Sequence, residues 1–336
     1  MSEARAVASE LPEAPARLVG DDGLPRFGLY AGSLADASFA TLKDIPGALQ
    51  RRLIEKKWQY AFVATPEMML AIAVIDCGYL ASGICAVFDR GSRRLLVNEN
   101  PVLPPICASV GEAPGDGLSA RLMGPAIRAR IQQASGKISI QAAWAHADVD
   151  LTLDANRAPP PLTAIAEVGA PGRFDFTQKT VLIPAEGEVR AGNIRFPVQG
   201  QLAGLDFTHG FLARETKWRW AFASGRAGSR LLAFNFSEGF LGGEGENAVW
   251  IDGEPLAVGP VELSFQPEAP QAPWHVRSED GRVDLTFQPE GHRAQKVDLK
   301  LISSRYVQPF GTFSGSLEGI AVEGLPGVAE DHAALW

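Results

Sequence analysis

Short runs of alternating apolar and polar residues follow one another along most of this chain. In the run at 147–154, ADVDLTLD, the residues Val149, Leu151 and Leu153 would face one side and the polar residues the other. Comparable runs recur roughly every ten residues, with Gly, Pro, Asn or Asp between them. This spacing is typical of antiparallel barrels and sandwiches. The pattern predicts an all-β protein.

Helical spacing occurs near the N-terminus. At 36–57 apolar residues recur at helical intervals, and basic residues gather near the C-terminal end of the segment, where they complement the helix dipole. Pro46 marks a break or a second start. The apolar positions are Phe39, Leu42, Leu49 and Leu53. At the other end of the chain, 327–336 predicts a short helix or plug that ends in Trp336.

The chain is longer than one core usually requires. With 336 residues it exceeds the common size of a single-core domain. Three consecutive prolines at 159–161 cannot serve a central strand and mark a boundary. We therefore expect a flexible segment at 1–25, a first β-barrel-like unit with its leading helix at 26–155, and a second unit at 162–336. No motif recurs at a fixed period, which favours a pair of similar barrels over a solenoid or propeller.

Composition narrows the class of protein. Hydrophobic residues make up 46% and charged residues 21%, as in ordinary folded, soluble proteins. The net charge is −8 and no basic stripe is present, so we expect no nucleic-acid partner. The N-terminus lacks the basic start and apolar run of a signal peptide. The most apolar run, 68–87, is interrupted by an aspartate, two glycines and two cysteines, so we expect no membrane span.

Cysteine and histidine spacing gives no sign of a metal or cofactor. Cys77, Cys85 and Cys107 lie in or beside apolar segments without CxxC spacing, which favours buried thiols in a reducing compartment, the cytoplasm, over disulfides or metal ligands. The five histidines are scattered, and the sequence contains no GxSxG, Walker or HExxH motif. We expect neither a metal nor a cofactor.

The segment 206–252 combines aromatic and polar residues in three consecutive predicted strands. Trp218 and Trp220 share one face of their strand. Asn235 lies in an apolar strand and needs hydrogen-bond partners if it is buried, whether it contacts a ligand or serves as a structural amide. This combination predicts an apolar pocket with a few inward polar groups. The expected ligand-binding residues are Trp218, Trp220, Asn235, Trp250, Gln178, His209 and Asn247.

Three carboxylates are candidate catalytic acids, and each also has a structural interpretation. Asp206 and His209, three residues apart at a predicted strand end, form either an orienting pair or a brace for a turn. Glu246 follows a glycine-rich run and lies either at the mouth of a strand or in a surface turn. Asp76 ends an apolar strand, where desolvation would raise its pKa, or it initiates the next turn.

A set of short motifs, weak singly and specific together, extends over most of the chain. They are Asp76-Cys77-Gly78-Tyr79-Leu80, Gln178-Lys179, Asp206 with Gly210, Trp218-Arg219-Trp220, Phe234-Asn235, Glu246-Asn247, Asp280-Gly281-Arg282 and the tail Glu330-Asp331-His332 to Trp336. With these motifs the chain resembles the proteins described as domain of unknown function 2804. It is distantly similar to the lipocalin-like hydroxyneurosporene synthase (carotenoid hydratase) and AttH group.

The resemblance implies two consecutive lipocalin-like antiparallel β-barrels or half-barrels. The segment 206–252 lies in the second unit, where we therefore expect the main pocket. The resemblance also implies an apolar cavity for a hydrophobic ligand but no known reaction. Phe207 stands where the family commonly has Trp, and His209 where it commonly has Arg. We therefore interpret His209 as a polar wall position more readily than as a base.

Our leading hypothesis is that the protein binds a hydrophobic small molecule, of lipid or isoprenoid type, in a β-barrel cavity. As an enzyme it would be a cofactor-independent lyase or isomerase of hydratase, cyclase or isomerase type. Such chemistry needs an acid kept protonated by desolvation and aromatic faces that stabilise a developing cation. The alternative is a non-catalytic carrier of a lipid or other hydrophobic ligand. The oligomeric state stays open.

Overall fold

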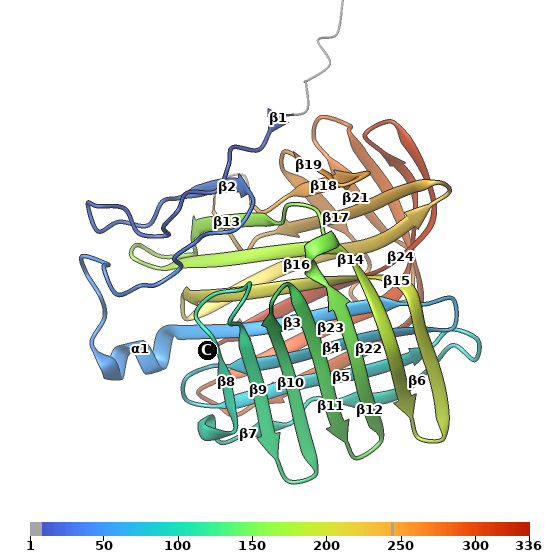
Figure 1. Ribbon diagram of the computed structural model, residues 1–336, viewed down its shortest axis with the longest axis horizontal. Coiled ribbons are helices and arrows are strands. Elements are labelled where there is room, and N and C mark those ends of the chain that lie inside the picture. The colour runs from blue at the N-terminus through green and yellow to red at the C-terminus, as the bar shows by residue number, and fades with distance from the viewer. Residues whose placement is uncertain (1–8, 243–244) are drawn as a thin grey trace, which may run out of the picture.

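The computed structural model describes residues 9–242 and 245–336, and two large antiparallel sheets make up most of them (Figure 1). The confirmed fold class is all-β. The one α-helix in these residues is α1 (Ala48–Ile54). Two short 3-10 helices lie at Pro105–Cys107 and Ala155–Arg157. None of the described helices is both long and apolar enough to cross a membrane.

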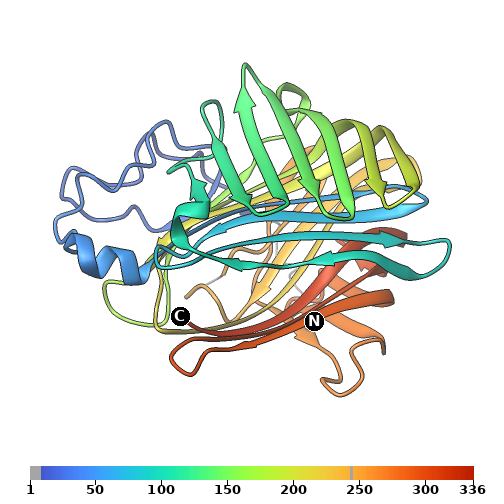
Figure 2. The ribbon, with the colours of Figure 1, turned by 90° about the horizontal axis from the view of Figure 1, so that it is seen from below.

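The first sheet has 14 strands and curls into a half-barrel (Figure 2). Its strands are β2 (Gly28–Ala31), β3 (Glu55–Ala64), β4 (Met68–Asp76), β5 (Ala81–Asp89), β6 (Arg94–Glu99), β7 (Val102–Leu103), β8 (Ala108–Val110), β9 (Ser119–Gly124), β10 (Ile127–Ala134), β11 (Lys137–Trp144), β12 (Ala147–Asp154), β13 (Leu162–Glu167), β14 (Phe174–Ala191) and β15 (Ile194–Phe211). The main order is β6-β5-β4-β3-β15-β14-β12-β11-β10-β9-β8. The sheet closes tightly on its core, since a Cβ added to Gly83 of β5 would lie 2.5 Å from Leu122 of β9.

The second sheet has 10 strands and encloses a core of its own. Its strands are β1 (Ser9–Glu10), β16 (Glu215–Ala227), β17 (Arg230–Glu238), β18 (Ala248–Ile251), β19 (Glu254–Ala257), β20 (Val261–Ser264), β21 (Trp274–Ser278), β22 (Val283–Asp298), β23 (Ser303–Leu317) and β24 (Ile320–Leu335). Their order is β1-β19-β18-β17-β16-β24-β23-β22-β21-β20. Consecutive strands pair through hairpins along most of this order, because tight turns connect antiparallel neighbours.

A third apolar layer joins the two sheets. Phe62 of β3 contacts Phe222 of β16 edge to face, with ring centroids 6.3 Å apart. Phe222 also fills the space beside Gly204, where a Cβ would lie 2.1 Å from its ring. Arg90, directly after β5 of the first sheet, forms two hydrogen bonds with Glu290 in β22 of the second, at 2.9 and 2.7 Å. The sheets are therefore packed together over a continuous interface.

Sheet membership changes between Phe211 and Glu215, whereas the sequence suggested a domain boundary near 156–162. The prolines at 159–161 join β12 to β13 inside the first sheet. The division of the chain into two domains, at 26–155 and 162–336, stays a prediction. Within the segment predicted to be flexible, residues 1–8 lie outside the described residues, while Leu18 and Val19 are buried in the first core.

The N-terminal helix is shorter than its periodicity predicted. Leu49 and Leu53 of α1 are 78% and 55% exposed, so the helix buries neither of them. Phe39 lies outside the helix and packs in the first core. Residues 55–57, expected in the helix, begin β3, because pairing with β15 and β4 satisfies their backbone groups.

The expected C-terminal helix is absent, because the tail continues as β24 up to Leu335. Its residues pair with β16 on one side and β23 on the other. The plug alternative fits better. The indole of Trp336 turns back to the inter-sheet region and donates a hydrogen bond to Thr216 Oγ1 at 2.7 Å.

The inter-sheet layer makes Phe222 a test of the fold. Replacing Phe222 with alanine removes a fully buried ring and leaves a cavity between two sheets, so we expect the free energy of unfolding to fall by about 3 to 5 kcal/mol. Phe27→Ala is the matched control, because that ring is 48% exposed. Urea unfolding of both variants measures the difference. Equal effects of the two substitutions would contradict the inter-sheet role.

Candidate functional site

A cavity with a volume of about 190 Å³ lies between the two sheets. Strands β3, β4, β5, β14 and β15 contribute one side, and β16, β22, β23 and β24 the other. Its aromatic lining is Trp58, Tyr60, Tyr79, Trp218, Trp220, Phe240, Tyr306 and Trp336, and its ionisable or hydroxyl lining includes Lys179, Asp206, Glu246, Glu330, His332 and Ser304. Residues of the predicted second unit, 162–336, and of the predicted first unit both contribute to this lining, whereas apolar side chains fill the core enclosed by the second sheet alone.

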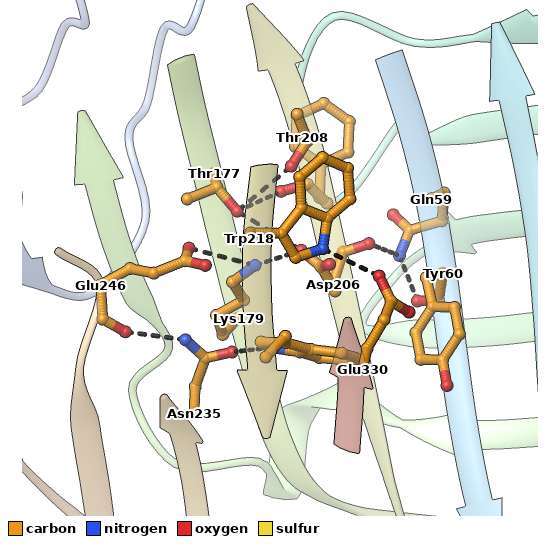
Figure 3. A network of polar contacts seen from close by, with 12 residues as sticks. Gln59, Tyr60, Thr177, Lys179, Asp206, Thr208, Trp218, Asn235, Glu246 and Glu330 are labelled. Atoms are coloured by element: carbon orange, nitrogen blue, oxygen red, sulfur yellow. Dashed lines mark hydrogen bonds and ion pairs between the residues drawn. The ribbon is translucent and has the colours of Figure 1, made fainter. Parts of the chain in front are cut away.

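Lys179 occupies the centre of the polar part of the cavity (Figure 3). Its Nζ lies 2.6 Å from Asp206 Oδ1 and 3.1 Å from Glu246 Oε2. Lys179 and Asp206 stand directly opposite each other on β14 and β15 of the first sheet, whereas Glu246 precedes β18 of the second. One ammonium group therefore links carboxylates from both sheets.

The charges in this cluster depend on one another. Burial opposes the charge on Lys179, but Asp206 and Glu246 outweigh it and raise the pKa of Lys179 above its ordinary value. Burial raises the pKa of Glu246, and Lys179 offsets part of that effect. Behind them, Asp175 is completely buried, and burial followed by the charge of Glu246 raises the pKa of Asp175 well above its ordinary value. The two carboxylates thus favour the ammonium form of Lys179, whereas burial disfavours the ionised form of Asp175.

Glu330 forms a second polar centre on the opposite side of the cavity. Its Oε1 accepts a hydrogen bond from Trp218 Nε1 and its Oε2 one from Gln308 Nε2, both at 2.8 Å. Burial raises the pKa of Glu330 to about 7, although the Trp218 hydrogen bond opposes this shift. Near neutral pH this carboxyl group is therefore divided between its acid and carboxylate forms.

His332 lies two residues further along the same face of β24. Its Nε2 is 2.8 Å from Ser304 Oγ, and its Nδ1 is 3.9 Å from Glu330 Oε1. Burial lowers the pKa of His332 to about 3, so the imidazole is neutral. The strand register explains the grouping, because Trp218 is directly opposite His332 and Trp220 directly opposite Glu330.

Four of the residues predicted for the site line the cavity: Trp218, Trp220, Asp206 and Glu246. Strand alternation brings the first two to the same face, and the ion pairs with Lys179 bring the other two together. Residues 243 and 244 of the glycine-rich run before Glu246 lie outside the described residues.

Two predicted amides lie behind the cavity wall. Asn235 is fully buried, accepts a hydrogen bond from Trp220 Nε1 at 2.8 Å and donates one to the backbone carbonyl of Glu246 at 2.7 Å. Asn247 accepts a hydrogen bond from the backbone N–H of Ser237 at 2.8 Å. Asn235 therefore orients Trp220 and the chain at Glu246 and does not itself line the cavity.

Two further predicted ligand-binding residues are also outside the lining. Gln178 neighbours Lys179 on β14, so its side chain leaves the opposite face of that strand. Trp250 is fully buried in the inter-sheet layer and donates a hydrogen bond to the backbone carbonyl of Pro160 at 2.9 Å. Both side chains support the wall from behind.

His209 and Asp76 lie away from the cavity lining. Asp206 and His209 do not form a pair, because residues three apart on a strand face opposite sides. His209 is buried in the first core, where it stacks on Phe39 with ring centroids 4.0 Å apart and its Nε2 lies 2.8 Å from Glu55 Oε1. Asp76 accepts a hydrogen bond from the backbone N–H two residues further on, at 2.9 Å, as a turn residue does.

Sequence reasoning missed Glu330, His332, Ser304 and Asp175 as site residues. Glu330 and His332 alternate along a strand, which would have marked one face, but the tail was interpreted as a helix or plug. Asp175 had the same signal as Asn235, since it is a polar residue between two phenylalanines.

A metal centre finds no support in the described residues. Among residues 9–242 and 245–336, no group of three or more histidine, cysteine, aspartate or glutamate side chains has an arrangement that could hold a metal ion. The carboxylates of the cavity instead surround Lys179.

The sheets and the cavity define a lipocalin-like protein built of two curved antiparallel sheets with a polar cluster between them. The chain belongs to the family described as domain of unknown function (DUF2804), which matches residues 9–336. No curated protein matches the sequence.

Solved structures share this fold at low sequence identity. CghA with Sch210972 is 12% identical over 97% of this chain and 98% of its own, with a TM-score of 0.55. A putative AttH from Nitrosomonas europaea is 10% identical over 86% of this chain and 97% of its own, with a TM-score of 0.51. At these identities the likeness shows a common fold.

Lys179→Met tests the central ion pairs. The substitution leaves Asp206 and Glu246 buried without their cation, so we expect the free energy of unfolding to fall by about 3 to 5 kcal/mol. Lys137→Met is the matched control, because its ion pair with Asp154 is half-exposed, and we expect a much smaller change. Chemical denaturation compares the two, and similar losses would contradict a special role for Lys179.

The pKa of Glu330 predicts a pH-dependent stability. Between the ordinary value of 4.5 and about 7, the folded state keeps a proton on Glu330 that the unfolded state releases. The free energy of unfolding should therefore fall as pH rises through this window, by up to about 3 kcal/mol. Glu330→Gln removes this contribution and leaves those of the other ionisable groups.

The measurement is denaturant unfolding of both proteins from pH 4.5 to 8. The groups that act on Glu330 from neighbouring strands, Arg293, Asp206, Tyr60 and Tyr306, are common to both. A constant difference between wild type and variant over the whole range would show that Glu330 does not hold the extra proton.

Proposed function

We propose that this protein binds a hydrophobic small molecule, of lipid or isoprenoid type, in the cavity between its sheets and acts on it by acid-assisted chemistry without a cofactor. The observation that carries this proposal is Glu330. Its carboxyl group borders an aromatic cavity, has a pKa of about 7, and forms no ion pair with any lysine or arginine among the described residues. Such a carboxyl can donate a proton and recover it near neutral pH.

The reaction types that suit this geometry are hydration, cyclisation and isomerisation. Protonated Glu330 would transfer its proton to a carbon–carbon double bond of the ligand, and the faces of Trp58, Trp218 and Trp220 would stabilise the cation that develops. In hydration, a water oxygen then bonds to the cationic carbon, and the proton that this water loses returns to Glu330. In isomerisation, Glu330 takes the proton from the neighbouring carbon.

Asp206 and Glu246, the catalytic acids expected from the sequence, suit a structural role better. Both lie within ion-pair distance of the Lys179 ammonium group. We infer that they hold Lys179 in place and shape the polar end of the cavity, while Glu330 acts as the acid. Separate substitution by the matching amides, Asp206→Asn and Glu246→Gln, compares their contributions.

The similar fold of CghA supports a small-molecule ligand, since that structure contains Sch210972. We also infer a cytoplasmic location, because Cys77, Cys85 and Cys107 are all free thiols and a reducing compartment preserves such thiols.

The test begins with native mass spectrometry of freshly purified protein, which identifies a bound ligand without a prior guess. With that compound, or its precursor, as substrate, we expect Glu330→Gln to lower turnover by about 100-fold or more, because the amide cannot donate the proton. Glu290→Gln is the matched control, since Glu290 pairs with Arg90 outside the cavity lining. Full turnover by Glu330→Gln would refute the acid role.

A non-catalytic carrier is the second candidate, and one observation favours it. Both oxygens of Glu330 already accept hydrogen bonds, and Lys179 already contacts two carboxylates. A carrier would release its ligand unaltered and in stoichiometric amount, and wild type and Glu330→Gln would yield the same compound.

A further inference from the structure

The cavity offers no free positive charge from the described residues. Lys179 is the basic residue of its lining, and its ammonium group lies between Asp206 and Glu246 (Figure 3). The imidazole of His332 is neutral and lies within hydrogen-bond distance of Ser304. A ligand that entered this space would meet no cation available to pair with it.

Two buried cations, Lys56 and Arg293, are held outside the lining. Lys56 donates hydrogen bonds to the backbone carbonyls of Leu53, at 2.6 Å, and Cys77, at 3.1 Å, and its ammonium group faces the ring of Tyr79. Arg293 is 2% exposed, and its guanidinium lies 4.8 Å from the centre of the Tyr306 ring. Neither cation is part of the cavity lining, and each faces an aromatic ring that is.

Carboxyl groups outnumber the one lysine of the lining. Asp206, Glu246 and Glu330 all line the cavity with Lys179, and two of them, Asp206 and Glu246, lie within ion-pair distance of its ammonium group. An anion brought into this region would lose its hydration and meet carboxylates in a medium of low dielectric constant. Without a partner cation, neither cost is offset.

The polar groups that remain for a ligand are uncharged. Tyr60 lines the cavity, and its phenol hydroxyl has no hydrogen-bond partner among the described residues. Burial raises the pKa of Tyr60 well above its ordinary value, so the phenol stays neutral. The Ser304 hydroxyl is a second neutral group. Both suit a hydroxyl or carbonyl oxygen of an otherwise apolar molecule.

We propose that the cavity selects against anions, so that its ligand is an uncharged apolar molecule with a hydroxyl or carbonyl group, and not a fatty acid or another carboxylate or phosphate. The excess of buried carboxyl groups over Lys179 carries this inference. It rests on the proposed ligand-binding function and names the chemical class of ligand.

Two fluorescent probes that share one ring system test the selection. N-phenyl-1-naphthylamine is uncharged, and 1-anilinonaphthalene-8-sulfonate carries a sulfonate. Titration at pH 8, with energy transfer from the cavity tryptophans and mutual displacement, shows whether both occupy the same site. We expect the uncharged probe to bind at least about tenfold more tightly to wild type, equivalent to about 1.4 kcal/mol.

Glu246→Gln provides the sharper comparison. It removes one of the two carboxylates beside Lys179, so the ammonium group keeps a single partner, Asp206, and an anion near it meets one carboxylate fewer. We expect the sulfonate probe to gain at least about tenfold in affinity, while the affinity for the uncharged probe stays within about twofold. Glu318→Gln is the matched control, because it makes the same change in an ion pair with Arg282 outside the lining, and neither affinity should change.

The outcomes separate the inference from the function on which it rests. Equal affinity of both probes for wild type, or an unchanged preference in Glu246→Gln, would overturn the charge selection and leave ligand binding intact. If neither probe enters the site, the proposed ligand-binding function fails, and the selection fails with it. If Glu246→Gln does not fold, Glu330→Gln at pH 8 removes a wall carboxylate without breaking an ion pair and should raise the affinity for the sulfonate probe.

Discussion

The rest of the structure depends on the burial of β3, β4 and β5 on both faces. Alternate residues of these strands enter two different cores, as Ala61 and Val63 pack inside the half-barrel while Tyr60 and Phe62 pack against the second sheet. Two sheets that share such a middle layer cannot separate without exposing it to water. The cavity occupies the part of this layer where polar residues replace apolar ones, so the packing of the sheets and the shape of the site have one physical origin.

Because β3, β4 and β5 are buried on both faces, only part of the fold could be predicted from the sequence. Strands with one solvent-exposed face alternate between apolar and polar residues, and 147–154 was recognisable as a strand for that reason. In contrast, 68–74 is apolar throughout, which identifies a buried strand but not its partners. The pairing of β3 with β15 joins residues 140 to 156 positions apart, and no local pattern carries that information. Sheet order and the place where one sheet gives way to the next therefore depend on tertiary pairing.

The candidate site was predictable where local alternation was enough. Trp218 and Trp220 share a face on any strand, whatever its partners. Lys179 became central only through its register with Asp206 and through Glu246 from the other sheet. The alternation of side chains along a strand also argues against a pair formed by Asp206 and His209. Residues three positions apart face opposite sides of a strand, and His209 accordingly lies in the half-barrel core. The tail was interpreted with the wrong periodicity, which concealed Glu330.

The ion pairs around Lys179 also set the electrostatic character of the cavity. A buried cation needs compensation, and two carboxylates from opposite sheets provide it while linking the sheets. That compensation consumes the positive charge that an anionic ligand would need. Glu330 accepts hydrogen bonds from Trp218 and Gln308 but forms no ion pair with a lysine or arginine among the described residues, and burial raises its pKa to about 7. The interaction that joins the sheets thus leaves, within an aromatic cavity, one carboxyl group that can hold a proton near neutral pH.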